Sequence, residues 1–225
     1  MNDLISICIT CKNRSRVVFN DDIVIELFPN LVDTLAKIVP HVNCEFELVV
    51  SDWMSTDWPL YEWLPEKLNN VMPYHIIKIK QKDFSRGMGR NIAFSYAKGD
   101  TIFFLDTDML ITDIGIFTHG RELIRNKEVF FPICYSYYDH QHIDGWWRTT
   151  GFGNLMVGRE QLRKVGPWKE KFSWGGEDDD MFLRLARIAP IIRTKEYGFY
   201  HQWHPEKKII KPKEKQGFWR KIFCK

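Results

Sequence analysis

The chain has 225 residues, and 44% of them are hydrophobic, which is enough to bury the core of one large domain. Its net charge of +3 is small and its basic residues are dispersed except at the C-terminal end, so nucleic acid is not an expected partner. No segment has the length and apolar character needed to span a bilayer, and the N-terminus lacks the basic start of a secretory signal. We therefore expect a cytoplasmic protein.

The N-terminal part of the chain alternates short apolar runs with stretches of helical periodicity. Such runs are typical of buried strands, and helices between them predict a mostly parallel sheet that is covered on both faces. The expected strands are residues 4–10, 46–52 and 75–80, and the expected helices are residues 23–39 and a segment that reaches about Met72.

Polar residues gather where these strands end. In a sheet of this kind, ligands collect at the carboxyl ends of the strands. Lys12, Asn13 and Arg14 follow the first strand, while Asp52 ends the second and Asp57 follows it. A ligand site is therefore expected at this edge of the sheet.

The five cysteines indicate reduced thiols rather than a disulfide framework, because they are odd in number and lie in apolar contexts. Cys8 and Cys11 form a C-x-x-C pair, but no second pair is present to complete a zinc site. Buried free thiols are the better interpretation.

Residues 84–91 lead into a further helix, which is expected to end near residue 98. Gly87 and Gly89 resemble the start of a dinucleotide-binding fingerprint, but its third glycine would fall at Ile92, which argues against a Rossmann cofactor. Arg86 and Arg90 either face a nucleotide or diphosphate, or they are solvated helix charges. The pattern leaves both alternatives open.

A strongly apolar strand, residues 101–105, runs directly into Asp106, Thr107 and Asp108. Burying two carboxylates there without a counter-charge would be costly, and a divalent cation is the simplest compensation. Mg²⁺ or Mn²⁺ held by one or two carboxylates keeps open positions for phosphate oxygens. The position of this D-x-D after a buried strand therefore predicts a metal site.

The segment that follows is expected to be rich in strands. Residues 128–138 have strand character, residues 139–148 form a polar loop, and residues 149–157 have strand character again. Gly151 and Gly153 in the last of these allow a ligand or backbone to approach closely.

Tryptophans in loops are candidates for stacking on sugar rings, and the candidates here are Trp146, Trp147 and Trp174. The alternative is a structural role, in which tryptophans fill the core or an interface. We expect this role for most of the nine tryptophans in the chain. The sequence alone does not separate the two cases for these three.

The most specific stretch is residues 173–185, in which an aromatic residue and two glycines precede four consecutive acids and an amphipathic helix. One interpretation is that Glu177 to Asp180 complement the helix dipole as N-cap and first-turn acids. Four successive carboxylates repel one another and point in different directions around a helix, so they do not share one structural partner. The alternative is that the helix start presents carboxylates to a polyhydroxyl ligand, with one of them acting as general base.

The C-terminal part holds two histidines and a basic tail. Residues 197–204 predict a strand with His201 and His204 near its end, and a third metal ligand is a candidate role for one of them. Residues 211–225 alternate basic residues with aromatic and aliphatic ones. This pattern is typical either of an interfacial helix at the inner membrane face or of a docked C-terminal helix.

Taken together, these motifs resemble those of nucleotide-sugar-dependent glycosyltransferases of the GT-A type, family 2-like. The chain is similar to the β-1,4-galactosyltransferases and to the galactosyltransferase-like domains of bacterial chondroitin polymerases. The resemblance covers nearly all of residues 4–205, and the stretch from Trp174 through Asp180 is its most specific part. The other matching segments, in the same order as in the family, are Lys12-Asn-Arg14, Phe84-Ser-Arg86 with Asn91, and Asp106-Thr-Asp108.

The resemblance implies a role for each motif. Asp106, Asp108 and, from a Tyr-His-Gln pattern, His201 would hold Mn²⁺ or Mg²⁺, and the metal would hold the donor diphosphate. Asp178 would deprotonate the acceptor hydroxyl, and Glu177, the second catalytic residue, would orient the acceptor sugar together with Asp179. Residues 203 to about 212 would close as a lid. The residues implied to bind the acceptor are Trp174, Gly176 and Asp179, and those implied to bind the nucleotide-sugar are Thr10, Lys12, Asn13, Arg14, Asp52, Arg86, Asn91, Asp106 and Thr107.

The expected fold class is α/β with the GT-A fold, in which a mostly parallel, Rossmann-like sheet is flanked by helices and a smaller portion serves the acceptor. Residues 1–110 are expected to form the nucleotide-sugar-binding half of a domain that extends to residue 205. Residues 111–205 are expected to form the acceptor and catalytic half, and residues 206–225 a basic lid and tail.

The expected function is inverting, metal-dependent transfer of a sugar from a UDP-sugar to a saccharide or lipid-linked saccharide, in the synthesis of a bacterial capsule, O-antigen or other surface polysaccharide. Glycoside hydrolysis is not favoured, because it needs a protonated carboxylic acid and has no use for a D-x-D. The alternative is a non-catalytic module that binds nucleotide-sugars or glycans on the same scaffold. Peripheral association with the inner membrane is a further expectation from the tail.

Overall fold

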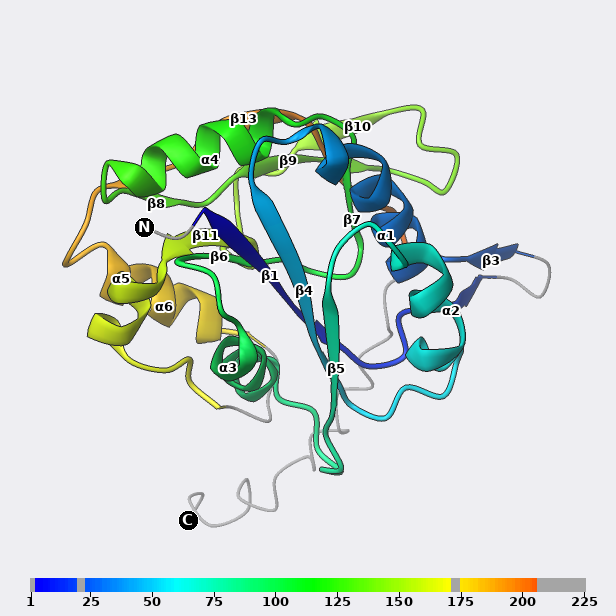
Figure 1. Cartoon of the computed structure of the whole chain (residues 1–225). Helices are drawn as coiled ribbons and strands as arrows, with labels where there is room; N and C mark the ends of the chain where they lie inside the picture. The colour runs from blue at the N-terminus through cyan, green and yellow to red at the C-terminus, as the bar shows by residue number, and fades with distance from the viewer. Residues whose placement is uncertain (1–2, 20–22, 171–174, 206–225) are drawn as a thin grey trace, which may run out of the picture.

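A seven-stranded sheet forms the centre of the computed structural model, which describes residues 3–19, 23–170 and 175–205 (Figure 1). Four neighbouring strands of this sheet run parallel, and they include the three that the apolar runs predict in the first eighty residues. They are, in spatial order, β6 (Thr101–Phe104), β1 (Leu4–Cys11), β4 (Glu45–Asp52) and β5 (Tyr74–Lys78). The prediction of a mostly parallel sheet flanked by helices is confirmed.

The other side of β6 carries an antiparallel strand, β11 (Leu155–Gly158), which places Leu155 opposite Phe104. Because the two strands run in opposite directions, the residues just before β11 lie beside the residues just after β6. The sheet ends with β8 (Val129–Phe130) and β12 (Ile191–Ile192). Residues 149–154, which were also predicted as strand, are irregular.

Helices cover both faces of this sheet (Figure 1). Successive residues of a strand point to opposite faces, so Phe103 and Phe104 belong to two separate cores. The core that contains Phe103 is closed by α1 (Leu27–Ile38), α2 (Leu60–Leu68) and α4 (Gly115–Arg125). The core that contains Phe104 is closed by α3 (Arg86–Tyr96), α5 (Arg159–Val165) and α6 (Glu177–Leu185).

A second, four-stranded sheet begins directly after the D-x-D. Its strands, in spatial order, are β10 (Gly145–Trp147), β9 (Ile133–Tyr137), β13 (Lys195–His201) and β7 (Met109–Ile111). Strand β13 runs antiparallel to β7 and places His201 opposite Met109. This register brings the end of the C-terminal strand next to Asp108.

The segment before α1 differs from its prediction. Residues 23–39 were expected to be one helix, but β3 (Ile23–Ile25) pairs with β2 (Val17–Phe19) as a hairpin, and the helix begins only at Leu27. The run Ile-Val-Ile consists of β-branched residues, which pack well in a strand and lose side-chain freedom in a helix. After α1, a short 3-10 turn, Val39–His41, leads to β4. Helices α4 and α5 were not predicted.

The four described cysteines confirm the interpretation as free thiols. Cys8, Cys11 and Cys134 are buried, and Cys44 is partly buried. Burial raises the pKa of the Cys11 thiol to about 12, which keeps it protonated and unreactive at neutral pH. Cys224 lies outside the described residues. None of the described helices is both long and apolar enough to cross a membrane.

Helix α3 lies so close to β1 and β4 that only glycine fits at position 89. A Cβ added to Gly89 would lie 2.3 Å from Thr10 Cγ2 and 2.9 Å from Ser51 Oγ. The glycine therefore serves packing of the helix against the strand ends, not a dinucleotide loop. Gly87 is equally confined, against the carbonyl oxygen of Lys169.

We expect Gly89→Ala to lower the free energy of unfolding by about 2 kcal/mol, as overpacked cores do. The direction of this change in stability is informative, because alanine at an unhindered helical glycine stabilises a protein by up to about 1 kcal/mol. Urea denaturation followed by circular dichroism measures the difference. A variant more stable than the wild type would show that α3 is not seated against Thr10 and Ser51.

Candidate active site

The D-x-D lies in the turn that joins the two sheets. Strand β6 ends at Phe104 and β7 begins at Met109, so Asp106, Thr107 and Asp108 occupy the connection. Thr107 is buried, and the two aspartates on either side of it have different partners. The two carboxylates are consequently held in different surroundings.

Asp108 is surrounded by the two C-terminal histidines. Its Oδ2 lies 3.2 Å from His204 Nε2, and its Oδ1 lies 3.9 Å from His201 Nε2. One ligand atom from each of the three residues fits within 4.8 Å of the others. The sequence pattern favours His201 over His204 as a metal ligand. The structure places both histidines beside the carboxylate of Asp108.

The far nitrogen of each imidazole is engaged by the protein. Ser136 Oγ lies 3.0 Å from His201 Nδ1, and the carbonyl oxygen of Pro205 lies 3.3 Å from His204 Nδ1. A carbonyl only accepts hydrogen bonds, so His204 Nδ1 carries a proton, and its Nε2 is the atom that faces Asp108. Partners of this kind orient metal-ligating histidines and fix their tautomer.

The charge state of this cluster suits a divalent cation. Burial lowers the pKa of His201, which favours the neutral form that binds metals. Burial by itself would raise the pKa of Asp108, but the two imidazoles beside it, that of His204 first, hold this pKa well below its usual value. One carboxylate and two imidazoles form a donor set that favours Mn²⁺ over Mg²⁺, which prefers oxygen ligands alone. The three residues therefore fit a metal of this class.

Gln202 holds the cluster to the rest of the fold, and pattern reasoning did not identify it. Its main-chain N–H donates to the carbonyl of Asp108 at 2.7 Å. Its buried amide donates to the carbonyls of Leu27 and Met109 and accepts from Asn30 Nδ2 at 2.9 Å. These bonds fasten the end of β13 to the start of α1 and to the D-x-D turn.

Asp106 does not join this cluster in the described part of the chain. Its Oδ1 lies 3.3 Å from Nη2 of Arg90, a side chain that is only 3% exposed. The same Nη2 donates to the carbonyl of Gly153 at 2.7 Å, and the guanidinium lies 4.4 Å from the ring centroid of Trp168. Arg90 therefore holds Asp106 from within the protein. It is not a solvated helix charge, which was one of the two alternatives for the arginines.

Two residues just before β11 also contact Asp106. Asn154 Oδ1 accepts the main-chain N–H of Asp106 at 2.9 Å. A Cβ added to Gly153 would lie 2.7 Å from Asp106 Oδ2, so the bare backbone of this glycine is what the turn requires. Only the register between β11 and β6 reveals these contacts, and the spacing of the motifs does not.

We expect Gly153→Ala to displace Asp106 and to weaken binding of UDP with Mn²⁺ by about tenfold, the cost of one disturbed polar contact. Gly151→Ala is the matched control. Gly151 has a φ of +86° and nothing within 4 Å of an added Cβ, so alanine there strains the backbone without reaching the site. Isothermal titration calorimetry on both variants compares them, and equal affinities would contradict the role given to Gly153.

The four consecutive acids form the first turn of α6, as expected, and they have different partners. Glu177 is 5% exposed and lies 3.8 Å from Arg86. Asp180 is bound by Lys169 and by Arg184, and although burial alone would raise its pKa, these hydrogen bonds hold it lower. Two of the four acids thus have structural partners.

The other two acids remain available to a ligand. Among the described residues, Asp178 and Asp179 form no ion pair, and the only hydrogen bond to the Asp178 carboxylate comes from the main-chain N–H of Asp179 at 3.2 Å. Asp178 is partly buried, whereas Asp179 is exposed. Gly176 before them has a φ of +85°, which glycine adopts without strain. Trp174 lies outside the described residues.

The D-x-D and the acids of α6 converge on Arg86. The pKa of this guanidinium is raised by the charge of Asp106 in the first place, against the effect of burial, and also by Glu177, Asp108 and Asp178. Arg86 lies 3.8 Å from Glu177, and Arg90, one turn further along α3, lies 3.3 Å from Asp106. The two acidic motifs, far apart in the sequence, therefore share one region of the molecule.

Five of the nine residues predicted for the nucleotide-sugar lie at the carboxyl ends of β1 and β4. Asn13, at a φ of 52°, accepts from the main chain of Thr56 at 2.9 Å. Asp52 accepts from the main chain of Ser55 at 3.0 Å and is buried. These contacts shape the loop at this edge. Of the others, Thr10 receives a hydrogen bond from Ser51, Lys12 donates to the carbonyl of Lys82, and the charge of Arg14 acts on Asp108.

Asn91 holds the segment that precedes α6. Its Oδ1 accepts the main-chain N–H of Trp168 at 2.8 Å, and its Nδ2 donates to the carbonyl of Trp168 at 3.0 Å and to Glu170 at 2.9 Å. Its amide hydrogens are thus used within the protein. The contact between Asn91 and the donor stays a prediction.

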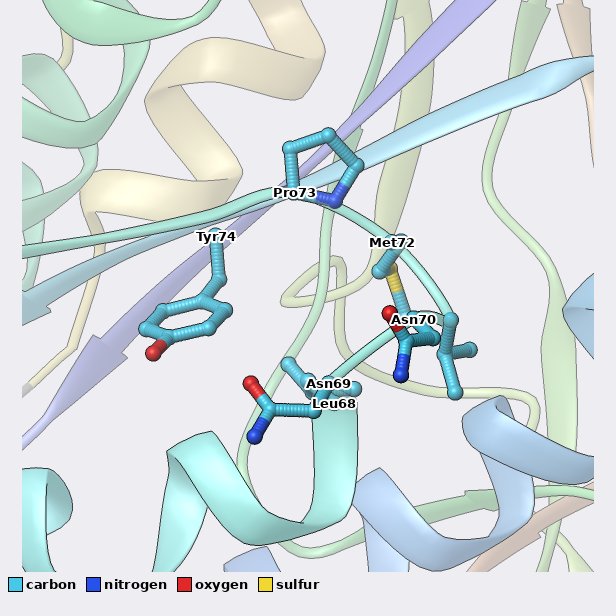
Figure 2. A pocket seen from close by; sticks show the side chains of 7 residues that line it. Leu68, Asn69, Asn70, Met72, Pro73 and Tyr74 are labelled. Carbon is cyan, nitrogen blue, oxygen red and sulfur yellow. The ribbon is translucent and has the colours of Figure 1, made fainter.

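A hollow on the surface lies far from these residues along the sheet. It is lined by Leu68, Asn69, Asn70, Val71, Met72, Pro73 and Tyr74, which connect α2 to β5 (Figure 2). Tyr74 begins β5, which runs parallel to β4. The hollow therefore lies at the amino edge of the sheet, opposite the edge where α/β proteins bind ligands.

Solved structures with this architecture identify the fold. S. aureus TarS, residues 1–349, matches with a TM-score of 0.68 and 18% identity over 90% of this chain and 60% of that chain. The catalytic domain of Drosophila β1,4-galactosyltransferase 7 matches with a TM-score of 0.54 and 17% identity, over 84% of this chain and 64% of that one. The fold is that of the GT-A glycosyltransferases.

The sequence identifies the family within this class. The family model for chondroitin N-acetylgalactosaminyltransferases matches residues 63–217, and the chain belongs to this family. Human chondroitin sulfate N-acetylgalactosaminyltransferase 1 is 28% identical over an alignment 148 positions long, gaps included, that covers 56% of this chain and 28% of the human protein. Chondroitin synthase of Pasteurella multocida (strain Pm70) is 25% identical over an alignment 256 positions long, gaps included, that covers 90% of this chain and 25% of that protein. The chain thus spans about a quarter of the length of these relatives, and the resemblance to chondroitin polymerases is confirmed.

Proposed function

We propose that this chain is an inverting, metal-dependent glycosyltransferase that moves a sugar from a UDP-sugar to a hydroxyl group of a saccharide acceptor. The observation that supports the proposal is that two arginines one turn apart on α3 contact the two acidic motifs: Arg90 lies 3.3 Å from Asp106, and Arg86 lies 3.8 Å from Glu177. Transfer needs a base on one side of the reacting carbon and charge stabilisation of the leaving diphosphate on the other. The two acidic motifs are suited to these two tasks.

Asp178 is the proposed base, because it is the partly buried acid of the motif that forms no ion pair within the described residues. Its carboxylate takes the proton of the acceptor hydroxyl as that oxygen forms a bond to the anomeric carbon of the donor. The bond from this carbon to the diphosphate breaks in the same step, and its electron pair leaves with the diphosphate. A single displacement of this kind inverts the configuration at the anomeric carbon.

Asp108, His201 and His204 are the proposed ligands of Mn²⁺, with Mg²⁺ as a weaker substitute. The metal would supply positive charge to the diphosphate oxygens during departure. Arg86 adds a second positive charge beside the same acids, and it lies 3.8 Å from Glu177. The proposed nucleoside pocket is lined by Thr10, Asp52 and the turn at Asn13.

The names of the relatives suggest the substrates to try first. The family is named for transfer of N-acetylgalactosamine in chondroitin, and a relative of bacterial origin is a chondroitin synthase. We therefore propose UDP-N-acetylgalactosamine as donor and a chondroitin-like saccharide as acceptor. Synthesis of a bacterial surface polysaccharide at the cytoplasmic face of the membrane is the setting proposed for this reaction.

The test is product formation with a panel of donors. The chain is incubated with Mn²⁺, chondroitin oligosaccharides and, in separate reactions, UDP-N-acetylgalactosamine, UDP-N-acetylglucosamine, UDP-galactose, UDP-glucose and UDP-glucuronate. Mass spectrometry should find an oligosaccharide longer by one sugar with one of these donors, and none after chelation of the metal. Binding of a donor without product from any of them would favour a non-catalytic module instead.

A further inference from the structure

A row of residues crosses the four-stranded sheet at one level. Trp146 of β10 pairs with Ser136 of β9. Ser136 pairs in turn with His201 of β13, and His201 with Met109 of β7. Side chains of directly opposed residues point to the same face of a sheet. Trp146 therefore projects from the face that carries His201, the neighbour of Asp108.

Trp146 stands near the cluster of Asp108 and the histidines, and its ring is open to solvent. Neighbouring strands lie about 4.8 Å apart, so two spacings separate the backbones of Trp146 and His201 by roughly 10 Å. Trp146 is 44% exposed, and its ring stacks on that of Tyr138, with ring centroids 5.1 Å apart and planes 21° apart. Tyr138 is itself 56% exposed. The pair presents flat apolar surface at the rim of the candidate active site.

Core packing does not account for this pair. The ring contacts of Trp146 and Tyr138 in the described chain are with each other, and about half of each residue is exposed to solvent. The next residue, Trp147, points to the opposite face, where it packs edge-on against Tyr135 and Tyr197. Trp147 thus packs on the outer surface of the sheet, whereas Trp146 faces the candidate active site.

We propose that Tyr138 and Trp146 form a stacking subsite for a pyranose ring of the acceptor saccharide. Aromatic side chains of this type combine apolar area with a polar edge, and the CH face of a sugar ring lies flat on such a surface while its hydroxyls stay solvated. This inference rests on the proposed function. It names a part of the acceptor site that none of the acidic motifs contains.

The position of the pair favours the acceptor over the donor. The proposed nucleoside pocket lies at the ends of β1 and β4 in the large sheet. Strand β10 is the edge of the small sheet farthest from β7, which directly follows the D-x-D. The cluster around Asp108 therefore lies between the nucleoside pocket and Trp146. A donor whose diphosphate is held at Asp108 has its nucleoside on the other side.

The experiment compares Trp146→Ala with Trp147→Ala, which removes the same side chain from the next position on the opposite face. With UDP-N-acetylgalactosamine, Mn²⁺ and a chondroitin octasaccharide, Trp146→Ala should raise the acceptor KM about tenfold and leave the donor KM unchanged. Trp147→Ala should change neither constant, and Trp146→Phe, which keeps a ring, should restore most of the acceptor KM. Thermal melting of each variant shows that it is folded. An acceptor KM of Trp146→Ala within about twofold of the wild type would overturn the subsite.

Direct binding separates this inference from the proposed function. Isothermal titration of the octasaccharide without donor should show weaker binding to Trp146→Ala than to the wild type and to Trp147→Ala. If the wild type transfers no sugar yet shows this pattern, the proposed function fails and the saccharide subsite stands. If the octasaccharide binds the wild type and Trp146→Ala equally, or binds neither, the subsite is wrong.

Discussion

Asp178→Asn should lower the rate of sugar transfer by about a thousandfold, within the range that general-base catalysis contributes. Asparagine keeps the size of the side chain but does not take up a proton from the acceptor hydroxyl. Donor affinity should change little, because Asp178 faces the acceptor in this account. Single-turnover kinetics with saturating donor, together with calorimetric titration of UDP, measure the two effects separately.

Asp179→Asn is the matched control for this substitution. It removes one carboxylate from the same turn of α6, and Asp179 is exposed and forms no described ion pair. Its effect on the helix dipole is equal, about 0.3–1 kcal/mol of stability. We expect at most a modest loss of transfer from it. If Asp178→Asn transfers sugar at the wild-type rate, or if Asp179→Asn is the inactive variant, the base is assigned to the wrong residue.

Asp108→Ala should abolish tight binding of Mn²⁺ and, with it, binding of the donor. The substitution removes the only carboxylate from the cluster and leaves His201 and His204 without their negative partner. Loss of a residue that only orients a metal ligand costs about ten- to a hundredfold in metal affinity, so loss of a ligand should cost more than about a hundredfold. Electron paramagnetic resonance of free Mn²⁺ during a titration measures this affinity directly.

Asp106→Asn separates the two acids of the D-x-D. Because Asp106 is held by Arg90 and lies outside the cluster around Asp108, the variant should bind Mn²⁺ within about threefold of the wild type. Donor binding should weaken, since the carboxylate that Arg90 holds is lost. Unchanged Mn²⁺ affinity in Asp108→Ala, or a greater loss in Asp106→Asn than in Asp108→Ala, would contradict the division between the two acids.

The apolar strands and the acidic motifs were the predictable part of this molecule. Runs such as Leu4–Cys11 and Thr101–Phe104 are buried on both faces of a parallel sheet, so their composition alone indicates their state. The helix at Glu177 follows from its periodicity, and the acids at its start are visible in the sequence. Ile23–Ile25 was assigned to a helix because a short apolar run fits either period, and only its pairing with Val17–Phe19 decides.

The residues that hold the site in place were not predictable, because strand register creates them. Ser136 reaches His201 only through the pairing of β9 with β13, and Gly153 and Asn154 reach Asp106 only through the pairing of β11 with β6. A shift by one residue would turn each of these side chains to the other face. A sequence gives no direct signal of such pairings across long separations.

A crystal of the chain grown with Mn²⁺ and a non-transferable UDP-sugar would test the central claim most directly. The account predicts an anomalous manganese peak bound by Asp108, His201 and His204, with the nucleoside at the ends of β1 and β4. It also predicts that the anomeric carbon of the sugar lies on the side of Asp178. Manganese bound elsewhere, or a nucleotide in the hollow lined by residues 68–74, would contradict it.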